Sequence, residues 1–162
     1  MTKDGKHLGL RLRPETERML RVFACMTCQS RCAVLESVLR CGLADAARDR
    51  GDDFWRAYRR EASEAYYAAV DEAIRLGRSL PAKLEMSGDE DDRPRSLVGF
   101  RIRGSTVDAL RAFARLADES LHDVADDAIR RRILYLATIA GDEFYEAWCR
   151  AVMYAMDREV VH

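Results

Sequence analysis

The chain repeats itself after 90 residues without a gap, and this repeat constrains its fold more than any other feature. When residues 8–65 are aligned with residues 98–155, eighteen of the 58 positions are identical. Two copies are too few for a solenoid, which needs about three or more repeats to bury a continuous core. Two copies suffice for a single-chain pseudo-dimer in which each unit covers the apolar face of the other. The identical pairs include Gly9/Gly99, Arg11/Arg101, Arg13/Arg103, Leu20/Leu110, Phe23/Phe113, Ser30/Ser120, Arg40/Arg130, Gly51/Gly141 and Phe54/Phe144.

Each copy opens with a strict alternation of apolar and polar residues, at 8–13 and at 98–103. Successive side chains of a strand point to opposite faces, so this alternation predicts one strand per copy with a single apolar face. Apolar residues then recur at helical spacing, and Ser30 and Ser120 stand where a second helix should begin. The sequence therefore predicts strand, helix, turn and helix, twice.

The spacing of the small and apolar residues resembles that of a ribbon-helix-helix unit of the Arc/MetJ class, over about 40 residues of each repeat. The resemblance implies that residues 8–12 pair with residues 98–102 as an antiparallel two-stranded ribbon within one polypeptide. A lone unit could neither pair its single strand nor cover its core. The positions that carry the resemblance are Leu12, Leu20, Ala24, Ser30 and Val38 in the first copy and Ile102, Leu110, Ala114, Ser120 and Ala128 in the second.

We therefore expect a mainly α-helical fold with a two-stranded antiparallel β-ribbon, built as a tandem ribbon-helix-helix pseudo-dimer. Apolar stripes over 52–76 and 142–158 predict an extension helix at the end of each repeat. The expected organisation is a first repeat with its extension helix at 1–77, an acidic linker at 78–95 and a second repeat with its extension helix at 96–162. The two repeats are expected to form one intertwined domain.

The net charge of −1 conceals a strong segregation of charge along the chain. Residues 1–50 hold ten Lys and Arg against six Asp and Glu, and residues 93–140 hold nine against six. The intervening residues 51–92 hold six against eleven, and residues 141–162 hold two against five. The strand-helix-helix units are thus basic and the segments after them acidic. A local basic face, rather than the overall isoelectric point, is what a DNA-binding surface requires.

The composition also indicates a compartment. No run of 18 apolar residues is present, so no membrane span is expected. The first residues, MTKDGKH, lack the apolar core of a secretory signal, so secretion is not expected. The five cysteines are odd in number and four of them lie in one half, which suits reduced thiols better than a disulfide framework. We therefore expect a cytoplasmic protein.

The resemblance implies that the outward side chains of the ribbon read bases in the major groove of double-stranded DNA. A two-stranded ribbon fits that groove, where arginine pairs bidentately with guanine. Two glycines on this face offer no side chain and could instead let the backbone of the ribbon approach DNA closely, leaving Arg11 and Arg101 as the main base readers. The expected base-reading residues are Arg11, Arg101, Gly9, Gly99 and His7, with Leu97 at the remaining outward position.

Phosphate contacts are expected from two other places. Arg13 and Arg103 leave the strands in each copy, and the second helix of each copy begins beside Ser30 or Ser120. Free backbone N–H groups and the helix dipole make such a helix end an anion site, and in the family it clamps the DNA backbone. Simple N-capping by the serines is compatible with this role. The expected phosphate-binding residues are Arg13, Arg103, Ser30, Arg31, Ser120 and His122, and for His122 a side chain without a special role is the alternative.

Two further patterns have ordinary explanations. Cys25, Cys28 and Cys32 invite a metal or redox interpretation, but the second copy has no cysteines at the equivalent positions, so the fold does not need them. Cys28 falls where the family usually turns with glycine. The aromatic residues of the extension helices are expected in the core or in a homodimer interface rather than around a ligand. No catalytic constellation stands out, so neither an enzyme, a cofactor nor a metal site is expected.

The expected function is sequence-specific DNA binding by a transcriptional repressor. The family also includes plasmid-partition, relaxosome and antitoxin proteins, and the fold cannot separate these roles. One alternative is a protein-interaction module of that kind with weak or no DNA binding. Another is DNA binding that depends on thiol oxidation or on metal at the three cysteines. The sequence leaves open the operator, the regulated genes and the oligomeric state.

Overall fold

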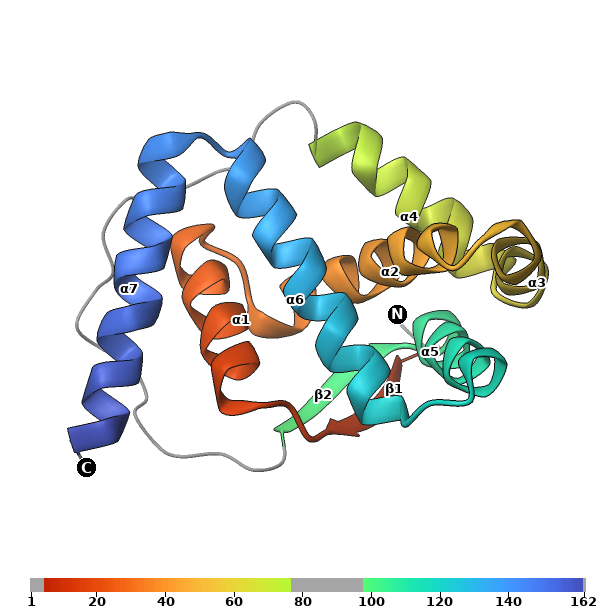
Figure 1. Cartoon of the computed structure of the whole chain (residues 1–162), viewed down its shortest axis with the longest axis horizontal. Coiled ribbons are helices and arrows are strands. Elements are labelled where there is room, and N and C mark those ends of the chain that lie inside the picture. The colour runs from red at the N-terminus through yellow and green to blue at the C-terminus, as the bar shows by residue number, and fades with distance from the viewer. Residues whose placement is uncertain (1–4, 77–97, 162) are drawn as a thin grey trace.

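A computed structural model of the chain describes residues 5–76 and 98–161. It is mainly helical, with one two-stranded antiparallel sheet (Figure 1). The elements recur in the same order after 90 residues, and α2 and α6 are offset by that number at both ends. In chain order they are β1 (Gly5–Leu10), α1 (Pro14–Met26), α2 (Arg31–Asp49), α3 (Asp52–Glu61), α4 (Ser63–Leu76), β2 (Val98–Arg103), α5 (Gly104–Ala117), α6 (Leu121–Ile139) and α7 (Asp142–Val161).

The two strands pair antiparallel about their glycines, with Gly9 opposite Gly99. β2 has the predicted bounds, but β1 starts at Gly5 and ends at Leu10 rather than running over residues 8–13. Since Leu10 pairs with Val98, a partner for residue 11 would have to be residue 97, which lies outside the described residues. The alternation of exposed and buried residues nevertheless continues as far as residue 13.

Both repeats make the same turn between their first two helices. The residues after α1 and α5, Cys28 and Asp118, have φ of +56° and +54°. The N–H groups of Gln29 and Glu119 then bond to the carbonyls of Ala24 and Ala114, each at 3.0 Å, as in a Schellman motif. Within residues 5–76 and 98–161 no single helix is long and apolar enough to cross a membrane. The pair α1 and α2, which is bent by 115°, has the length and composition of a membrane span only when the two helices are taken together.

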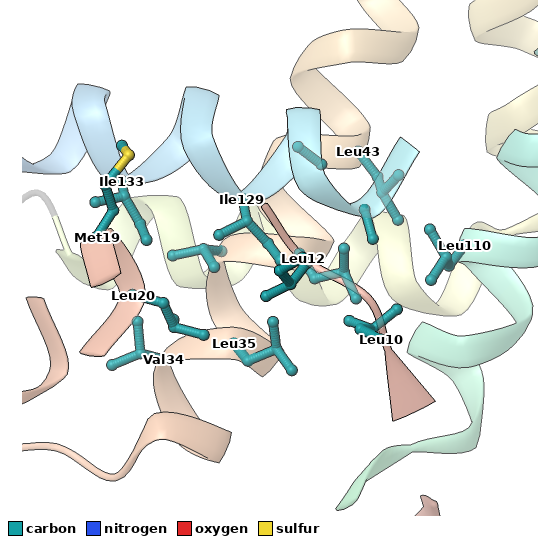
Figure 2. Close-up of a cluster of buried hydrophobic side chains, with 14 of the residues drawn as sticks. Leu10, Leu12, Met19, Leu20, Val34, Leu35, Leu43, Leu110, Ile129 and Ile133 are labelled. Atoms are coloured by element: carbon teal, nitrogen blue, oxygen red, sulfur yellow. The ribbon is translucent and has the colours of Figure 1, made fainter. Parts of the chain in front are cut away.

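One hydrophobic core joins both repeats. Leu8, Leu10, Phe100 and Ile102 form the inward face of the ribbon, and all four are buried. They lie under α1, α2, α5 and α6, so neither repeat has a core of its own. Figure 2 shows side chains from these elements converging: Leu10, Leu12, Met19, Leu20, Val34, Leu35, Leu43, Leu110, Ile129 and Ile133.

The segments after the second helices cross over to the other repeat. α3 packs on α5 and α7 packs on α1, beside which it runs in Figure 1. Equivalent phenylalanine pairs mark these contacts: the rings of Phe54 and Phe113 lie 4.9 Å apart between centroids, and those of Phe23 and Phe144 lie 5.8 Å apart. Both pairs meet edge to face, the arrangement that aromatic quadrupoles favour. The predicted placement of these aromatics in the core is confirmed for Tyr58, Tyr66, Phe144 and Trp148.

The extension of the first repeat differs from the prediction of one helix over 52–76. The chain breaks at Ala62, whose φ of −117° and ψ of 33° end α3, and α4 then packs on α2. The apolar stripe beyond Ala62 is therefore buried against a different helix, with Tyr66 and Ala69 lying in a small cluster beside Cys41 and Ala44. In the second repeat α7 continues as one helix to Val161. The predicted linker, 78–95, lies outside the described residues.

Candidate nucleic-acid interface

The outward face of the ribbon is exposed and carries the predicted base-reading residues. The side chains alternate strictly across the two strands, so burial of the leucines and of Phe100 and Ile102 turns the intervening residues outward. None of the residues of β1 and β2 is acidic. The exposed residues at or beside this face are His7, Gly9, Arg11, Gly99, Arg101 and Arg103, whereas Leu97 lies outside the described residues.

His7 and Gly99 are closely associated at the centre of this face. His7 pairs with Arg101 in the ribbon, and its imidazole lies over the neighbouring Gly99. A Cβ atom on Gly99 would lie 3.4 Å from the His7 Cε1 atom. This is an ordinary van der Waals distance, so the ring lies against Gly99 and covers part of the backbone that was expected to approach DNA closely.

Three arginines at or beside the ribbon, all singled out by the sequence, are exposed. Within the described part of the chain, the guanidinium groups of Arg11, Arg101 and Arg103 have no carboxylate partner, whereas those of Arg40, Arg50, Arg115, Arg131 and Arg132 each form an ion pair. An unpaired exposed arginine keeps all five of its donors available to a ligand. The ribbon face therefore offers cationic donors that no internal carboxylate neutralises.

The exits from the strands are held by carboxylates of the opposite repeat. The backbone N–H of Arg13 donates to Asp126 Oδ1 at 2.9 Å, and that of Arg103 donates to Glu36 Oε2 at 3.0 Å. Glu36 also accepts the hydroxyl of Thr106 at 2.7 Å. Glu36 and Asp126 are 90 residues apart, six residues after the two cap serines. Neither residue was predicted from the sequence, although an acid at the same place in both repeats was a usable signal.

Arg13 and Arg103 consequently differ in how free their side chains are. The Nε atom of Arg13 lies 3.7 Å from Asp126 Oδ2, a carboxylate that is almost fully buried. Arg103 forms no such pair within the described residues, because Glu36 is already engaged by Thr106 and Arg40. Of these two predicted phosphate-binding residues, Arg103 is thus the more available.

The N-termini of α2 and α6 are both exposed, at Ser30 and Ser120. Ser30 caps α2 through its hydroxyl, which accepts the N–H of Ala33 at 3.1 Å. Ser120 occupies the cap position of α6 without a side-chain cap bond. Arg31 lies in the first turn of α2, but its guanidinium is 3.5 Å from Glu17. These helix ends therefore offer backbone N–H groups more directly than they offer the arginine.

His122 has a definite structural role, which the sequence did not indicate. Its Nδ1 atom accepts the backbone N–H of Arg11 at 3.1 Å, across 111 residues of sequence. An imidazole that accepts at Nδ1 carries its proton on Nε2, where it remains a donor. His122 thereby links the start of α6 to the ribbon residue expected to read a base. The equivalent position in the first repeat is Cys32, so this link breaks the symmetry of the two repeats.

The cysteines do not form a recognisable metal centre. Cys28 is exposed, Cys25 and Cys32 are half-buried, and all are free thiols. Within residues 5–76 and 98–161 there is no group of three or more His, Cys, Asp or Glu side chains that could hold a metal ion. Cys28 has a positive φ, a backbone conformation that glycine adopts more readily than other residues.

No family model, no curated protein and no solved structure matches this chain. The candidate interface combines the exposed face of the ribbon, arginines without a carboxylate partner among the described residues, and two flanking helix ends at Ser30 and Ser120.

Proposed function

We propose that this chain is a sequence-specific DNA-binding protein of the ribbon-helix-helix type, with two tandem units acting as a pseudo-dimer within one polypeptide. The ribbon would enter the major groove, and the N-termini of α2 and α6 would hold the flanking phosphates. Transcriptional repression is the role we expect. The cytoplasm is the corresponding location.

The exchange of elements between the repeats supports the pseudo-dimer. The strands pair with each other, Glu36 and Asp126 each bond to the opposite repeat, and the equivalent phenylalanine pairs cross in both directions. A covalent fusion of two such units keeps these contacts while allowing the two DNA-facing strands to diverge. His7 and His122 are examples of such divergence, since Leu97 and Cys32 stand at the equivalent positions.

The single observation that carries the proposal is the exposed basic face of the ribbon. Arg11 and Arg101 occupy equivalent positions on either side of the Gly9–Gly99 pair and have no ion-pair partner within the described residues. Each good bidentate contact between arginine and guanine contributes about 1–3 kcal/mol of discrimination against other bases. Two such residues could therefore supply a large part of the preference for a specific site.

The test is selection of a binding site from a random-sequence pool of duplex DNA, followed by fluorescence anisotropy across a salt series. We expect the wild type to enrich one site and to bind it with an affinity that falls steeply with salt, since each neutralised phosphate contributes a slope of about −0.9. The double variant Arg11→Ala/Arg101→Ala should lose at least about tenfold of its preference for that site over random DNA.

The matched control removes the same charge elsewhere. Arg56 in α3 and Arg150 in α7 are exposed, and both helices pack on other helices. The variant Arg56→Ala/Arg150→Ala should retain the preference of the wild type. If the wild type enriches no sequence and binds no DNA at low salt with its thiols reduced, the proposal is wrong. Equal losses in the two double variants would instead indicate a general effect of charge.

The alternative function is a protein-interaction module, and one observation favours it. The last turns of α6 expose Leu134, Tyr135 and Ile139 to between 42% and 50%. The extension helices also expose Tyr67 and Met153, each at 63%, which is the surface through which a homodimer would form. Light scattering of the purified chain separates the cases: self-association without DNA binding would favour the module.

A further inference from the structure

A cavity of about 270 Å³ lies between α2, α4 and α6, away from the ribbon. Its floor is formed by buried side chains, among them Cys41, Ala69 and Arg132. Its rim includes Asp45, which is half-exposed, and Arg48, which is exposed. Ala44 and Val70 complete its walls.

The cavity depends on the break at Ala62 in the first repeat. That break lets α4 fold back on α2, whereas α7 continues as one helix. The second repeat also lacks the lining residues: Tyr135 and Thr138 stand where the first has Asp45 and Arg48. Arg132 itself stands at the position of Gly42. The fold of the repeat unit therefore does not require this set of side chains.

The charges around the cavity favour an anion. Two guanidinium groups, of Arg48 and Arg132, face one carboxylate, of Asp45, which lies 3.1 Å from Arg132 Nη1. The side chain of Arg132 is only 8% exposed, and its Nε atom is buried without a hydrogen-bond partner among the described residues. A buried donor without an acceptor is unfavourable, so an acceptor within reach of this guanidinium would be favourable.

The remaining walls are apolar. Ala44, Ala69 and Val70 contribute methyl groups, and Cys41 contributes a thiol. Burial raises the pKa of that thiol to about 11, so it stays neutral near pH 7 and adds no negative charge. The volume corresponds to roughly nine water molecules at about 30 Å³ each, which suits a molecule with a similar number of non-hydrogen atoms.

We propose that this cavity binds a small organic monocarboxylate, whose carboxylate lies between Arg48 and Arg132 and whose short apolar body lies against α2 and α4. One excess positive charge matches a monoanion better than a phosphate dianion. The apolar walls match a hydrocarbon body, which a bare inorganic anion lacks. Binding of this ligand does not depend on the DNA-binding function.

A regulatory consequence follows only if the proposed function is correct. The ligand would bridge α2 and α6, which pack directly on each other and begin at Ser30 and Ser120. A molecule held between Arg48 and Arg132 would favour one arrangement of the two helices, and hence one separation of the two expected phosphate clamps. We therefore expect the carboxylate to change the affinity for DNA by at least about threefold.

The experiment titrates the full chain with butyrate, 3-methylbutanoate and phenylacetate, each against its neutral amide and against inorganic phosphate. Calorimetry measures the affinity, and amide chemical shifts locate the site. At least one carboxylate should bind, shift the resonances of α4 and the C-terminal half of α2, and bind at least tenfold more tightly than its amide. The variant Arg48→Gln should lose about tenfold in affinity, since hydrogen bonds to charged groups are strong.

Two further variants make the test decisive. Ala69→Leu fills the cavity and should abolish binding, while Arg56→Gln, outside the cavity, should leave it unchanged. Circular dichroism verifies that each variant is folded; Arg48 is exposed, so Arg48→Gln should fold even if Ala69→Leu does not. The proposal is overturned if no carboxylate binds at 10 mM (about 2.7 kcal/mol of binding free energy), if amide and carboxylate bind equally, or if phosphate binds more tightly.

The two proposals fail separately. If a carboxylate binds in the cavity and the chain selects no DNA site, the proposed function is wrong and the ligand site stands. If DNA is bound and its affinity is unchanged by saturating carboxylate, the regulatory consequence is wrong and both sites stand.

Discussion

Asp126 accepts a hydrogen bond from the backbone N–H of Arg13 at 2.9 Å, although 113 residues separate them in the sequence. The same relationship joins Glu36 to the N–H of Arg103 at 3.0 Å. In both cases a carboxylate on the second helix of one repeat holds the point where the other repeat passes from strand to helix. These bonds set where the ribbon lies relative to α2 and α6, and thus where its arginines lie relative to the helix ends.

Replacing Asp126 with alanine should destabilise the fold. Asp126 is 2% exposed, and its loss leaves the N–H of Arg13 without its acceptor in a partly buried place. We expect the free energy of unfolding to fall by about 1–3 kcal/mol in urea denaturation. The neighbouring Asp127→Ala is the control, because Asp127 is exposed and should change stability by less than about 0.5 kcal/mol. Equal effects of the two variants would contradict this role for Asp126.

Replacing Gly42 with alanine should also destabilise the protein, against the usual preference of helices. In an exposed helix this change stabilises by about 1 kcal/mol. Here a Cβ on Gly42 would lie 2.3 Å from the backbone oxygen of Ala128 in α6, and a helix backbone cannot move aside cheaply. We expect a net loss of about 1–3 kcal/mol, measured by urea denaturation. Ser37→Ala on the same helix provides the comparison, and stabilisation by Gly42→Ala would show that the helices are not so close.

The two phenylalanine contacts should differ in strength according to burial. Phe144 is 3% exposed in its contact with Phe23, whereas Phe54 is only half-buried against Phe113. We expect Phe144→Ala to cost about 3–5 kcal/mol and Phe54→Ala clearly less, in the same denaturation assay. A larger loss for Phe54→Ala would mean that α3, rather than α7, is the more important brace.

Most of the fold could be predicted because the same sequence pattern occurs in both repeats. Strand alternation, the helical stripes and the serines at the starts of α2 and α6 are local signals, and their recurrence after 90 residues removed most ambiguity. The break at Ala62 could not be predicted in this way. Its cause is tertiary: Tyr66 and Ala69 bury against α2, although the stripe on which they lie is continuous in the sequence.

The candidate site could be predicted only in part. The exposed face of the ribbon follows from the alternation of apolar and polar residues alone, so the outward positions of His7, Arg11 and Arg101 could be predicted. The acceptor role of His122 depends on a contact across 111 residues, and the seating of His7 over Gly99 depends on a side-chain conformation. Neither has a local signature. The cavity beside Arg132 likewise depends on three helices meeting.

Replacing Cys28 with glycine should stabilise the protein. Cys28 has φ of +56°, where a residue with a Cβ is strained by about 1–2 kcal/mol. Glycine removes that strain but adds about 0.5–1 kcal/mol of unfolded-state entropy, so we expect a net gain of about 0.5–1 kcal/mol. Cys25→Gly, within α1, should instead lose about 1 kcal/mol.

The same variant tests the thiol hypothesis. If DNA binding depended on oxidation or metal at the three cysteines, Cys28→Gly would abolish the response to reductant or chelator. We expect the affinity for the selected DNA site to be the same with and without reductant, in the wild type and in Cys28→Gly alike. A response in the wild type that disappears in the variant would favour the redox-dependent alternative.

Stability should fall between pH 9 and pH 11 because of Cys41. Burial raises the pKa of this thiol from 9.0 to about 11. Below pH 9 the thiol is protonated in both states; between 9 and 11 only the unfolded chain releases the proton, so unfolding becomes easier, and above 11 the loss is complete. Two pKa units correspond to about 2–3 kcal/mol.

Urea denaturation measures this loss. Between pH 9 and pH 11 the free energy of unfolding of the wild type should fall by about 2–3 kcal/mol more than that of Cys41→Ala. Burial, and to a lesser extent the neighbouring Cys41, also raise the pKa of the Tyr58 phenol, so the difference between the two proteins reports Cys41 together with its effect on Tyr58. Parallel curves would contradict the burial of the thiol.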